Sequence, residues 1–454
     1  MEHPRHAIIP PYLLRHLAET AEPAVARRAK RTLRKDLTFR AGRSVTAPGA
    51  EPPRTSMLPG DAAPKREIST ANNTEKLPGT VVRREGEAAT GDVAADEAYD
   101  GFGATWTLFH DIYGRDSIDG AGMLLPGTVH YGKGYDNAFW DGDRMVFGDG
   151  DGQVFGRFTA SVEVLGHELT HGVIERTAGL VYQGQSGALN EHIADVFGSL
   201  VKQHRLGQDA GAADWLIGAD LLMPGVNGVA IRSMIAPGTA YDDPRLGKDP
   251  QPDHMDRFVR TTEDRGGVHI NSGIPNRAFA LAAQAIGGPA WLGAGQVWYD
   301  VLTGGQLDAR ADFAAFAALT VAAARARFGE GSREHTAIED AWQQVGVTGA
   351  ANVEAEPVTP SPSEAELLLR RTGGVTGVVR ERRTPLGELP PRDARRWNSL
   401  LTSDTLLSLA GRDPIADGFC YRVACEALEV DVTVAEQNLT TSQRNLFQRT
   451  LLAE

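Results

Sequence analysis

The stretch SVEVLGHELTHGVIERTAGLVYQGQSGALNEHIAD, residues 161–195, decides how the chain folds. A helix is predicted for its first half, because apolar residues recur there at helical spacing and Gly179 offers a stop. His167 and His171 are four positions apart on that helix, so both imidazoles project from one face. Two nitrogen ligands at this separation suit a single tetrahedral zinc ion.

The carboxylates that such a site needs follow in the same stretch. Glu168 can reach a water on the metal without binding the metal itself. After a loop rich in Gly, Gln and Ser (residues 182–187), a second helix is predicted to begin near Asn190. We expect Glu191 on this helix to be the third zinc ligand. One turn later, Asp195 is expected to hold a ligating imidazole in the right tautomer.

The motifs HELTH and GLVYQGQSGALNE resemble those of the thermolysin family of zinc endopeptidases, and within it the protealysin-like branch. The resemblance extends from about Arg66 to Val347. It implies an α+β, two-lobed metallopeptidase fold, with a β-rich N-terminal lobe, a mainly helical C-terminal lobe and the zinc helix at their junction. It also implies a neutral endopeptidase that cuts on the N-terminal side of bulky hydrophobic residues.

The resemblance assigns four more residues to the catalytic site. Arg232, in the motif IRSM, would hold a substrate carbonyl by two hydrogen bonds. His269, in EDRGGVHINSGIPN, would donate a hydrogen bond to the oxyanion, and Asp264 would orient its imidazole. Tyr182, at the end of GLVY, offers a phenol donor to the same oxyanion.

The same resemblance implies where a peptide substrate would lie. Asn137 and the backbone of Ala138, in the edge strand NAFW, would pair with an extended substrate. The side chain after the scissile bond would enter an apolar pocket lined by Phe155, Phe158, Val164, Ile217, Leu221 and Ile231. Burial there is worth about 1.5–3 kcal/mol for a large apolar side chain, which favours a bulky hydrophobic residue at that position.

One group of positions departs from the thermolysin pattern. The family's double calcium site would fall at Glu163, Lys202, Asp214, Leu216 and Ala219, of which only Glu163 and Asp214 are acidic. Calcium takes about six to eight oxygen ligands, so we expect this site to be degraded. The Lys202 ammonium would take over part of the cation's role by pairing with Glu163 or Asp214; calcium binding remains the open alternative.

The composition and the first residues of the chain indicate which partners to expect and where the protein resides. The net charge of −13 argues against a nucleic-acid partner. No apolar run approaches the roughly 18 residues of a membrane span, so no membrane association is expected. The opening MEHPRHAIIPPYLLRHLAE has no uninterrupted apolar segment and does not resemble a secretory signal. Cytoplasmic residence is therefore predicted, with export by a route that needs no such signal as the alternative.

The 454 residues exceed one compact core, and several domains are expected. The predicted segments are 1–45, a propeptide with a PPY motif as in protealysin-like precursors; 46–66, a Pro/Ala/Gly-rich linker; 67–182, the N-terminal peptidase lobe with the zinc helix; 183–350, the helical C-terminal lobe; 351–365, a second linker; and 366–454, a small α+β domain. The alternative for the first segment is a helix that simply docks on the next domain.

The last domain shows a Gly-Gly hairpin signal, a helix, two alternating strands and a closing helix. Its pattern resembles emfourin, the proteinaceous inhibitor of protealysin-like peptidases. The resemblance implies an inhibitor domain fused to its own target. Partners would then be peptide or protein substrates, the chain's own propeptide and this inhibitor-like domain. A docking or targeting module is the alternative.

Two further hypotheses remain for the whole chain. One is a catalytically silent zinc-binding scaffold that keeps the motif without activity. The other is a self-inhibited module that acts mainly through protein–protein interaction. A peptide-hydrolysis assay after removal of the propeptide tests the first. A non-covalent complex that persists after cleavage of the linker would favour the second.

Overall fold

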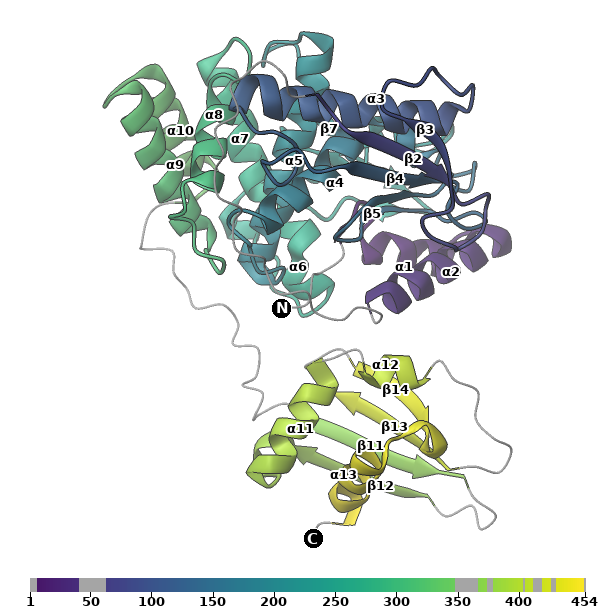
Figure 1. The fold of residues 1–454 in the computed structure, drawn as a ribbon. Helices are drawn as coiled ribbons and strands as arrows, with labels where there is room; N and C mark the ends of the chain where they lie inside the picture. Colours follow the sequence, from purple (N-terminus) through teal and green to yellow (C-terminus); the bar gives the residue numbers. More distant parts are fainter. Residues whose placement is uncertain are drawn as a thin grey trace. The chain divides into compact units, whose positions relative to one another are not determined.

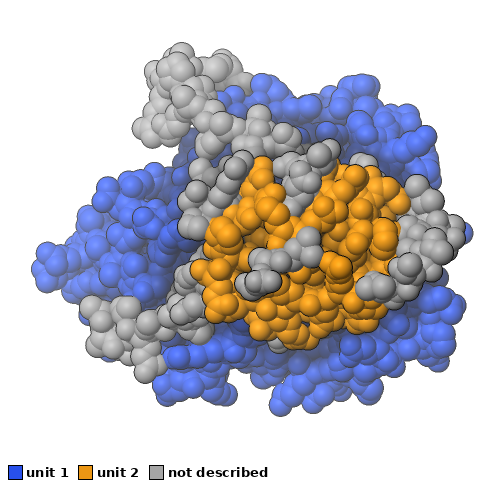
Figure 2. Space-filling view, turned by 90° about the horizontal axis from the view of Figure 1, so that it is seen from below, with its two compact units in different colours: residues 1, 3–33, 46–353 blue, residues 2, 34–45, 354–454 orange. Residues whose placement is uncertain are grey.

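The computed structural model describes residues 6–40, 63–347, 366–373, 379–402, 405–410, 419–425 and 430–452. The chain divides into two compact units, residues 1, 3–33 and 46–353 and residues 2, 34–45 and 354–454 (Figure 2). Each unit has its own cluster of buried apolar side chains. Among the described residues, no helix combines the length and the apolar character that crossing a bilayer requires.

A six-stranded mixed sheet forms the β-rich part of unit 1, in the order β1-β5-β6-β4-β2-β3. Its strands are β1 (His6–Ala7), β2 (Arg66–Thr70), β3 (Thr80–Arg84), β4 (Leu125–Val129), β5 (Ala138–Trp140) and β6 (Met145–Phe147). Strand β4 runs parallel to β2 and β6, and the other neighbours are antiparallel. Helix α3 (Val93–Thr107), continued by a π-helical turn (Leu108–Ile112), lies across this sheet (Figure 1).

The N-terminal segment supplies an edge strand, one helix and the first part of a second helix to unit 1. Strand β1 pairs with β5, and helices α1 (Pro11–Thr20) and α2 (Pro23–Arg40) follow it (Figure 1). Proline starts α1 because its fixed φ suits the first helical position and its missing N–H needs no partner there. The apolar face of α1 belongs to the core of unit 1, with Leu13, Leu14 and Leu17 fully or almost fully buried.

The two helices of the zinc motif, α4 (Val162–Glu175) and α5 (Gly184–Leu206), pack closely on each other. Glycines let them approach. A Cβ atom on Gly166 would lie 3.1 Å from the Gly198 Cα atom, and one on Gly198 would lie 3.0 Å from the His167 backbone nitrogen. Such distances leave no room for a side chain at the crossing, so the spacing of the two helices depends on these glycines.

The predicted start of the second helix near Asn190 is wrong, because α5 begins at Gly184. The glycines of the stretch 182–187 indicated a loop, but Gly187 is helical. A Cβ atom there would lie 2.9 Å from the Tyr182 carbonyl carbon and closer still to Val268. Glycine is therefore needed at this position for close packing inside a helix, which a sequence pattern does not distinguish from a turn.

The rest of unit 1 is mainly helical, and its helices are α6 (Asp264–Asn271), α7 (Gly273–Ile286), α8 (Ala294–Thr303), α9 (Phe313–Phe328) and α10 (Arg333–Gln344). Short pairs join β7 (Leu216–Ile217) to β8 (Arg232–Ser233) and β9 (Asp242–Asp243) to β10 (Gly247–Lys248). Aromatic side chains fill the centre: the Trp298 ring stacks on Trp342 at 6.0 Å, and the Trp298 Nε1–H donates to His192 on α5 at 2.7 Å. The predicted two-lobed α+β fold is confirmed.

Unit 2 is a small α+β domain, as predicted. Its antiparallel sheet has the order β12-β11-β13-β14, with strands β11 (Glu366–Thr372), β12 (Arg380–Pro385), β13 (Cys420–Cys425) and β14 (Val430–Ala435). Its helices are α11 (Pro391–Thr402), α12 (Thr405–Ala410) and α13 (Thr441–Leu452). The Phe447 ring packs against Trp397 at 4.7 Å and Tyr421 at 5.1 Å, so these helices and the sheet share one core.

The Gly198→Ala substitution should destabilise unit 1. Its methyl group would push against the main chain of α4, and overpacking of this kind costs about 1–3 kcal/mol in the free energy of unfolding. Urea unfolding of the whole chain measures the change. Gly211→Ala is the matched control, since nothing lies within 4 Å of a Cβ at Gly211. Equal stability of the two variants would contradict the packing argument.

Candidate active site

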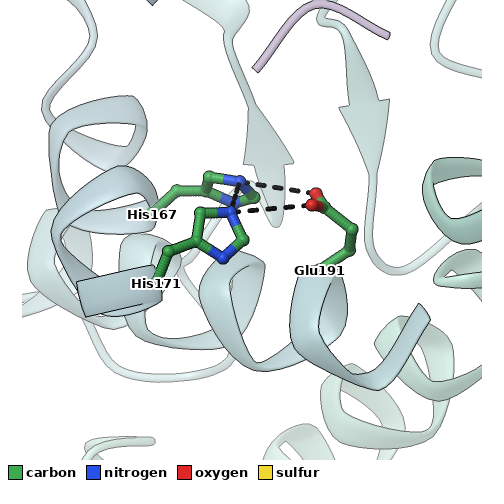
Figure 3. A group of neighbouring side chains, drawn as sticks. All are labelled: His167, His171 and Glu191. Atoms are coloured by element: carbon green, nitrogen blue, oxygen red, sulfur yellow. Dashed lines mark hydrogen bonds and ion pairs between the residues drawn. The ribbon is translucent and has the colours of Figure 1, made fainter. Parts of the chain in front are cut away.

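Three side chains from α4 and α5 converge at the centre of unit 1. His167 and His171 are fully buried, with perpendicular rings and Nε2 atoms 3.0 Å apart. Glu191 faces them, with Oε2 lying 3.5 Å from His167 Nε2 and Oε1 lying 3.6 Å from His171 Nε2 (Figure 3). One ligand atom from each residue lies within 4.8 Å of the others. The structure thus brings together the three residues that the sequence predicts as zinc ligands.

The second nitrogen of each imidazole faces an oxygen acceptor. His167 Nδ1 lies 2.8 Å from Asp195 Oδ1, and His171 Nδ1 lies 2.8 Å from Asn190 Oδ1. An acceptor at Nδ1 favours the tautomer that carries its hydrogen there, so each Nε2 presents a lone pair to the other. Two facing lone pairs beside a carboxylate are stabilised by a cation between them. This donor set fits zinc with three protein ligands and a fourth position for water.

Sequence reasoning missed Asn190. Its side-chain oxygen meets His171, while its amide nitrogen donates to the Leu180 carbonyl at 3.2 Å. The available signal was its place directly before Glu191 on the same helix. Amide side chains are common there for many structural reasons, so a sequence pattern does not single this one out.

Glu168 lies between the imidazoles and the edge strand β5. Its Oε2 accepts the Trp140 backbone N–H at 3.1 Å, while Oε1 is buried and has no hydrogen-bond partner within the described part of the chain. Burial, followed by the charge of Glu191, raises the pKa of Glu168 well above its usual value. A carboxylate held by one oxygen, with the other beside the ligand cluster, is suited to accept a proton from water.

Asp195 joins the imidazole of His167 to the guanidinium of Arg232. Arg232 donates to it through two nitrogens, Nε to Oδ2 at 2.9 Å and Nη2 to Oδ1 at 2.8 Å, and Asn276 Nδ2 donates to Oδ2 at 2.9 Å. Burial opposes ionisation of Asp195, but Arg232 and the His167 hydrogen bond outweigh it and hold its pKa well below the usual range. A charged Asp195 can therefore orient both partners.

His269, Asp264 and Tyr182 form a chain of hydrogen bonds beside the ligand cluster. His269 Nδ1 lies 2.7 Å from Asp264 Oδ1, and its Nε2 lies 3.1 Å from the Tyr182 hydroxyl, which donates a short bond to Glu191. Burial alone would lower the pKa of His269, but the Asp264 carboxylate raises it. A protonated imidazole can donate from Nε2, which is what stabilising an oxyanion requires.

The backbone conformation at the start of α6 places the Asp264 carboxylate beside the His269 imidazole. Four successive residues, Asp264 to Gly267, have positive φ angles between 51° and 86°. Asp264 Oδ2 then also accepts the His269 backbone N–H at 2.9 Å. Arg265 places its guanidinium carbon 5.8 Å from the centre of the Tyr182 ring. The turn thus holds the Asp264 carboxylate against His269, and Arg265 lies near the phenol.

The residues expected to bind substrate hold the chain's own N-terminal segment. Ile8 N–H donates to the Ala138 carbonyl at 3.2 Å, and Ile9 N–H donates to Asn137 Oδ1 at 3.0 Å. Asn137 Nδ2 donates back to the Ile9 carbonyl at 3.3 Å, and Arg232 Nη1 donates to the Ile8 carbonyl at 3.2 Å. An extended peptide therefore lies on the edge strand in unit 1.

The six residues expected to line the substrate pocket are all buried, namely Phe155, Phe158, Val164, Ile217, Leu221 and Ile231. The rings of Phe155 and Phe158 have centroids 6.1 Å apart. Ile217 lies opposite Arg232 in the β7–β8 pair, which brings apolar surface next to the guanidinium that holds the Ile8 carbonyl. The structure thus keeps these side chains within one apolar cluster of unit 1.

At the positions matched to the family's calcium site, the ammonium group of Lys202 provides a positive charge. Lys202 Nζ lies 2.8 Å from Asp214 Oδ2 and 3.5 Å from Oε1 of the fully buried Glu163. Oε1 of Glu163 also accepts from the Ser161 hydroxyl at 2.8 Å and the Gly218 N–H at 3.1 Å. Leucine at 216 and alanine at 219 provide no side-chain oxygen. Two of the five matched side chains are carboxylates, and both face the Lys202 ammonium.

Two imidazoles one helical turn apart, a carboxylate from the next helix and a second carboxylate against an edge strand define the active site of a zinc metalloendopeptidase. Comparisons with known proteins agree. Residues 60–175 match the thermolysin metallopeptidase catalytic domain, and residues 178–347 match the thermolysin metallopeptidase alpha-helical domain. Residues 369–451 match the family model of emfourin.

Relatives cover most of unit 1. An extracellular metalloprotease of Pectobacterium carotovorum subsp. carotovorum is 49% identical over 344 residues, 75% of this chain and 96% of the relative. Protease PrtS of Photorhabdus sp. (strain Az29) is 52% identical over 284 residues, 62% of this chain and 76% of the relative. The solved precursor of protealysin, a metalloproteinase from Serratia proteamaculans, is 50% identical with a TM-score of 0.68, covering 76% of this chain and all (100%) of that one.

The chain belongs to the thermolysin family of metallopeptidases. Within that family it resembles the protealysin-like branch, and its last domain resembles emfourin.

The Asn190→Ala substitution should weaken zinc binding by about 10–100-fold, the usual effect of losing a partner that orients a ligating imidazole. Competition with a chromophoric chelator measures the affinity. Asn190→Asp is the matched control, since it keeps an acceptor for His171 Nδ1 and should bind zinc at least as tightly as the unmodified chain. Unchanged affinity in Asn190→Ala would remove this residue from the site.

Proposed function

We propose that the chain is the precursor of an endopeptidase that cuts on the N-terminal side of bulky hydrophobic residues and is restrained by segments at both ends. One observation carries the proposal. His167, His171 and Glu191 converge beside an edge strand that already binds an extended peptide, the chain's own residues 6–9. Metal ligands and a bound peptide in one place are what peptide hydrolysis requires.

The protein's own groups have distinct roles in the reaction. Zinc bound by the three ligands would lower the pKa of a water molecule and polarise the substrate carbonyl. Glu168 accepts the proton of that water and passes it to the departing amide nitrogen. Tyr182 and His269 donate hydrogen bonds to the oxyanion, and Asp264 orients the imidazole and favours its protonated form.

The preference for a bulky hydrophobic residue after the scissile bond rests on the apolar cluster around Ile217 and Ile231. Arg232 fixes the carbonyl of that residue, so its side chain must enter the neighbouring apolar surface. A charged side chain there would lose its hydration without a partner, which costs more than an apolar side chain gains by burial.

The N-terminal segment acts as a propeptide that occupies the substrate position. It takes the hydrogen bonds of Asn137, Ala138 and Arg232 that a substrate would need. Its helix α1 adds a buried apolar face, so the strand does not depend on those bonds alone. Because β1 already pairs with β5, an external peptide must displace this segment to bind there.

Replacing the proposed proton carrier by Glu168→Gln should lower peptide hydrolysis by about 10²–10⁴-fold, because general acid–base catalysis contributes this much. The measurement is cleavage of a quenched fluorescent peptide after removal of the N-terminal segment. Zinc content should stay near that of the unmodified chain, since Glu168 is no ligand. Loss of zinc together with activity would assign Glu168 to the metal site, and absence of hydrolysis in the unmodified chain would favour a silent scaffold.

Lys202 would replace calcium as the counter-charge of Glu163. The Lys202→Met substitution leaves this buried carboxylate without its cation and should cost about 1–3 kcal/mol in the free energy of unfolding. Lys248→Met, at an exposed position, is the control. Added calcium should leave the Tm of the unmodified chain unchanged. Tight calcium binding that protects the chain from autolysis would show that the family's site persists.

The emfourin-like domain is proposed to restrain the peptidase. Its own core supports independent folding of unit 2. A chain that ends at residue 350 should hydrolyse peptide several-fold faster than the full chain, once both have lost the N-terminal segment. A chain that ends at residue 365 keeps the linker and serves as the control. Equal rates for all three, with no inhibition by added residues 366–454, would leave a docking role for this domain.

A further inference from the structure

The N-terminal strand lies on the edge strand with a defined register. His6 is opposite Trp140 and Ala7 is opposite Phe139 in an antiparallel pair. The next residue, Ile8, continues the pairing through its N–H, which donates to the Ala138 carbonyl at 3.2 Å. One peptide bond, that between Ala7 and Ile8, therefore joins the paired strand to the residues held by side chains.

After that bond, the backbone N–H and carbonyl groups of Ile8 and Ile9 are all hydrogen-bonded. Arg232 Nη1 holds the Ile8 carbonyl at 3.2 Å. Asn137 holds both the N–H of Ile9, at 3.0 Å, and its carbonyl, at 3.3 Å. Arg232 in turn is locked by two hydrogen bonds to Asp195, which also contacts the ligand His167. The register relative to the metal ligands is thus fixed by buried polar groups.

Two observations place Ile8 directly after the reacting bond. Its backbone N–H donates to the Ala138 carbonyl on β5, the same strand whose Trp140 N–H donates to Glu168, the proton carrier under the proposed function. Its side chain is branched, apolar and fully buried, which is the kind of residue that the apolar cluster beside Arg232 selects. The segment thus lies in the direction and register of a substrate.

We propose that the chain hydrolyses its own Ala7–Ile8 bond in an intramolecular reaction. The inference rests on the proposed peptidase function. The oxygen of a water molecule bonds to the Ala7 carbonyl carbon, and the bond from that carbon to the Ile8 nitrogen breaks. Glu168 moves a proton from the water to the Ile8 nitrogen. The products are a carboxylate at Ala7 and an amine at Ile8, and water is the only co-reactant.

Hydrolysis of the Ala7–Ile8 bond would not separate the propeptide from the peptidase. Residues after Ile8 remain attached through helix α1, whose leucines at 13, 14 and 17 are buried in unit 1. Ile8 and Ile9 also keep their bonds to Arg232 and Asn137. The reaction needs no second protein molecule, since the residues on both sides of the bond pair with β5, the strand that contacts Glu168, and holding reactants in place lowers a barrier.

The experiment uses the full chain, stripped of metal by a chelator and then supplied with zinc. Intact-mass spectrometry should show loss of the residues up to Ala7 and a new N-terminus at Ile8, at a rate that does not depend on protein concentration. Glu168→Gln should keep the bond intact. Ile8→Asp should abolish the cut, Ile8→Leu should retain it, and the exposed Glu19→Gln is the matched control that should behave like the unmodified chain.

A readout on the metal-free chain tests the register without catalysis. Hydrogen exchange should show protected amides at Ile8 and Ile9, and Ile8→Asp should lose this protection while the rest of unit 1 keeps its own. An uncut Ala7–Ile8 bond in a zinc-loaded preparation that cleaves external peptides would overturn the inference and leave the proposed function standing. A rate that rises with protein concentration would overturn it too. Failure to cleave any peptide, after removal of the N-terminal segment, would instead refute the proposed function.

Discussion

The close contact between helices α4 and α5 determines the rest of the site. Gly166 and Gly198 let the two main chains approach so closely that no side chain fits between them. His167 and His171 then meet Glu191 from the facing helix, and the atoms that bind metal come within a few ångströms. A wider spacing would separate the imidazoles from the carboxylate, because neither helix alone carries a complete ligand set. The packing of two helices thus creates a chemistry that neither sequence segment has by itself.

Much of this site was predictable, and the reason is local periodicity. A spacing of four residues fixes the relative direction of His167 and His171 on any helix. Asn190 and the start of α5 were not predictable in the same way. Asn190 acts through a contact between helices, and Gly187 is needed for packing in a helix where its residue type indicates a loop. The two-lobed fold followed from the family motifs, and composition alone did not specify it.

The N-terminal segment shows how a sheet edge can serve two purposes. An unpaired strand edge is a hazard for any protein, because its free N–H and C=O groups attract other chains. In this chain β1 covers the edge of β5. The same groups are the ones that a peptide substrate would use. Under the proposed function, the same hydrogen bonds of residues 6–9 both protect the edge and restrain the enzyme.

Asp195 has a consequence for how the protein responds to its ligands. One of its oxygens accepts from both His167 and Arg232, and the other accepts from Arg232 and Asn276. His167, which belongs to the metal-ligand cluster, and Arg232, which holds the Ile8 carbonyl, thus both bind the buried Asp195 carboxylate. By thermodynamic reciprocity, whatever factor an ion at His167 applies to the affinity for a peptide at Arg232, the peptide applies to the affinity for the ion.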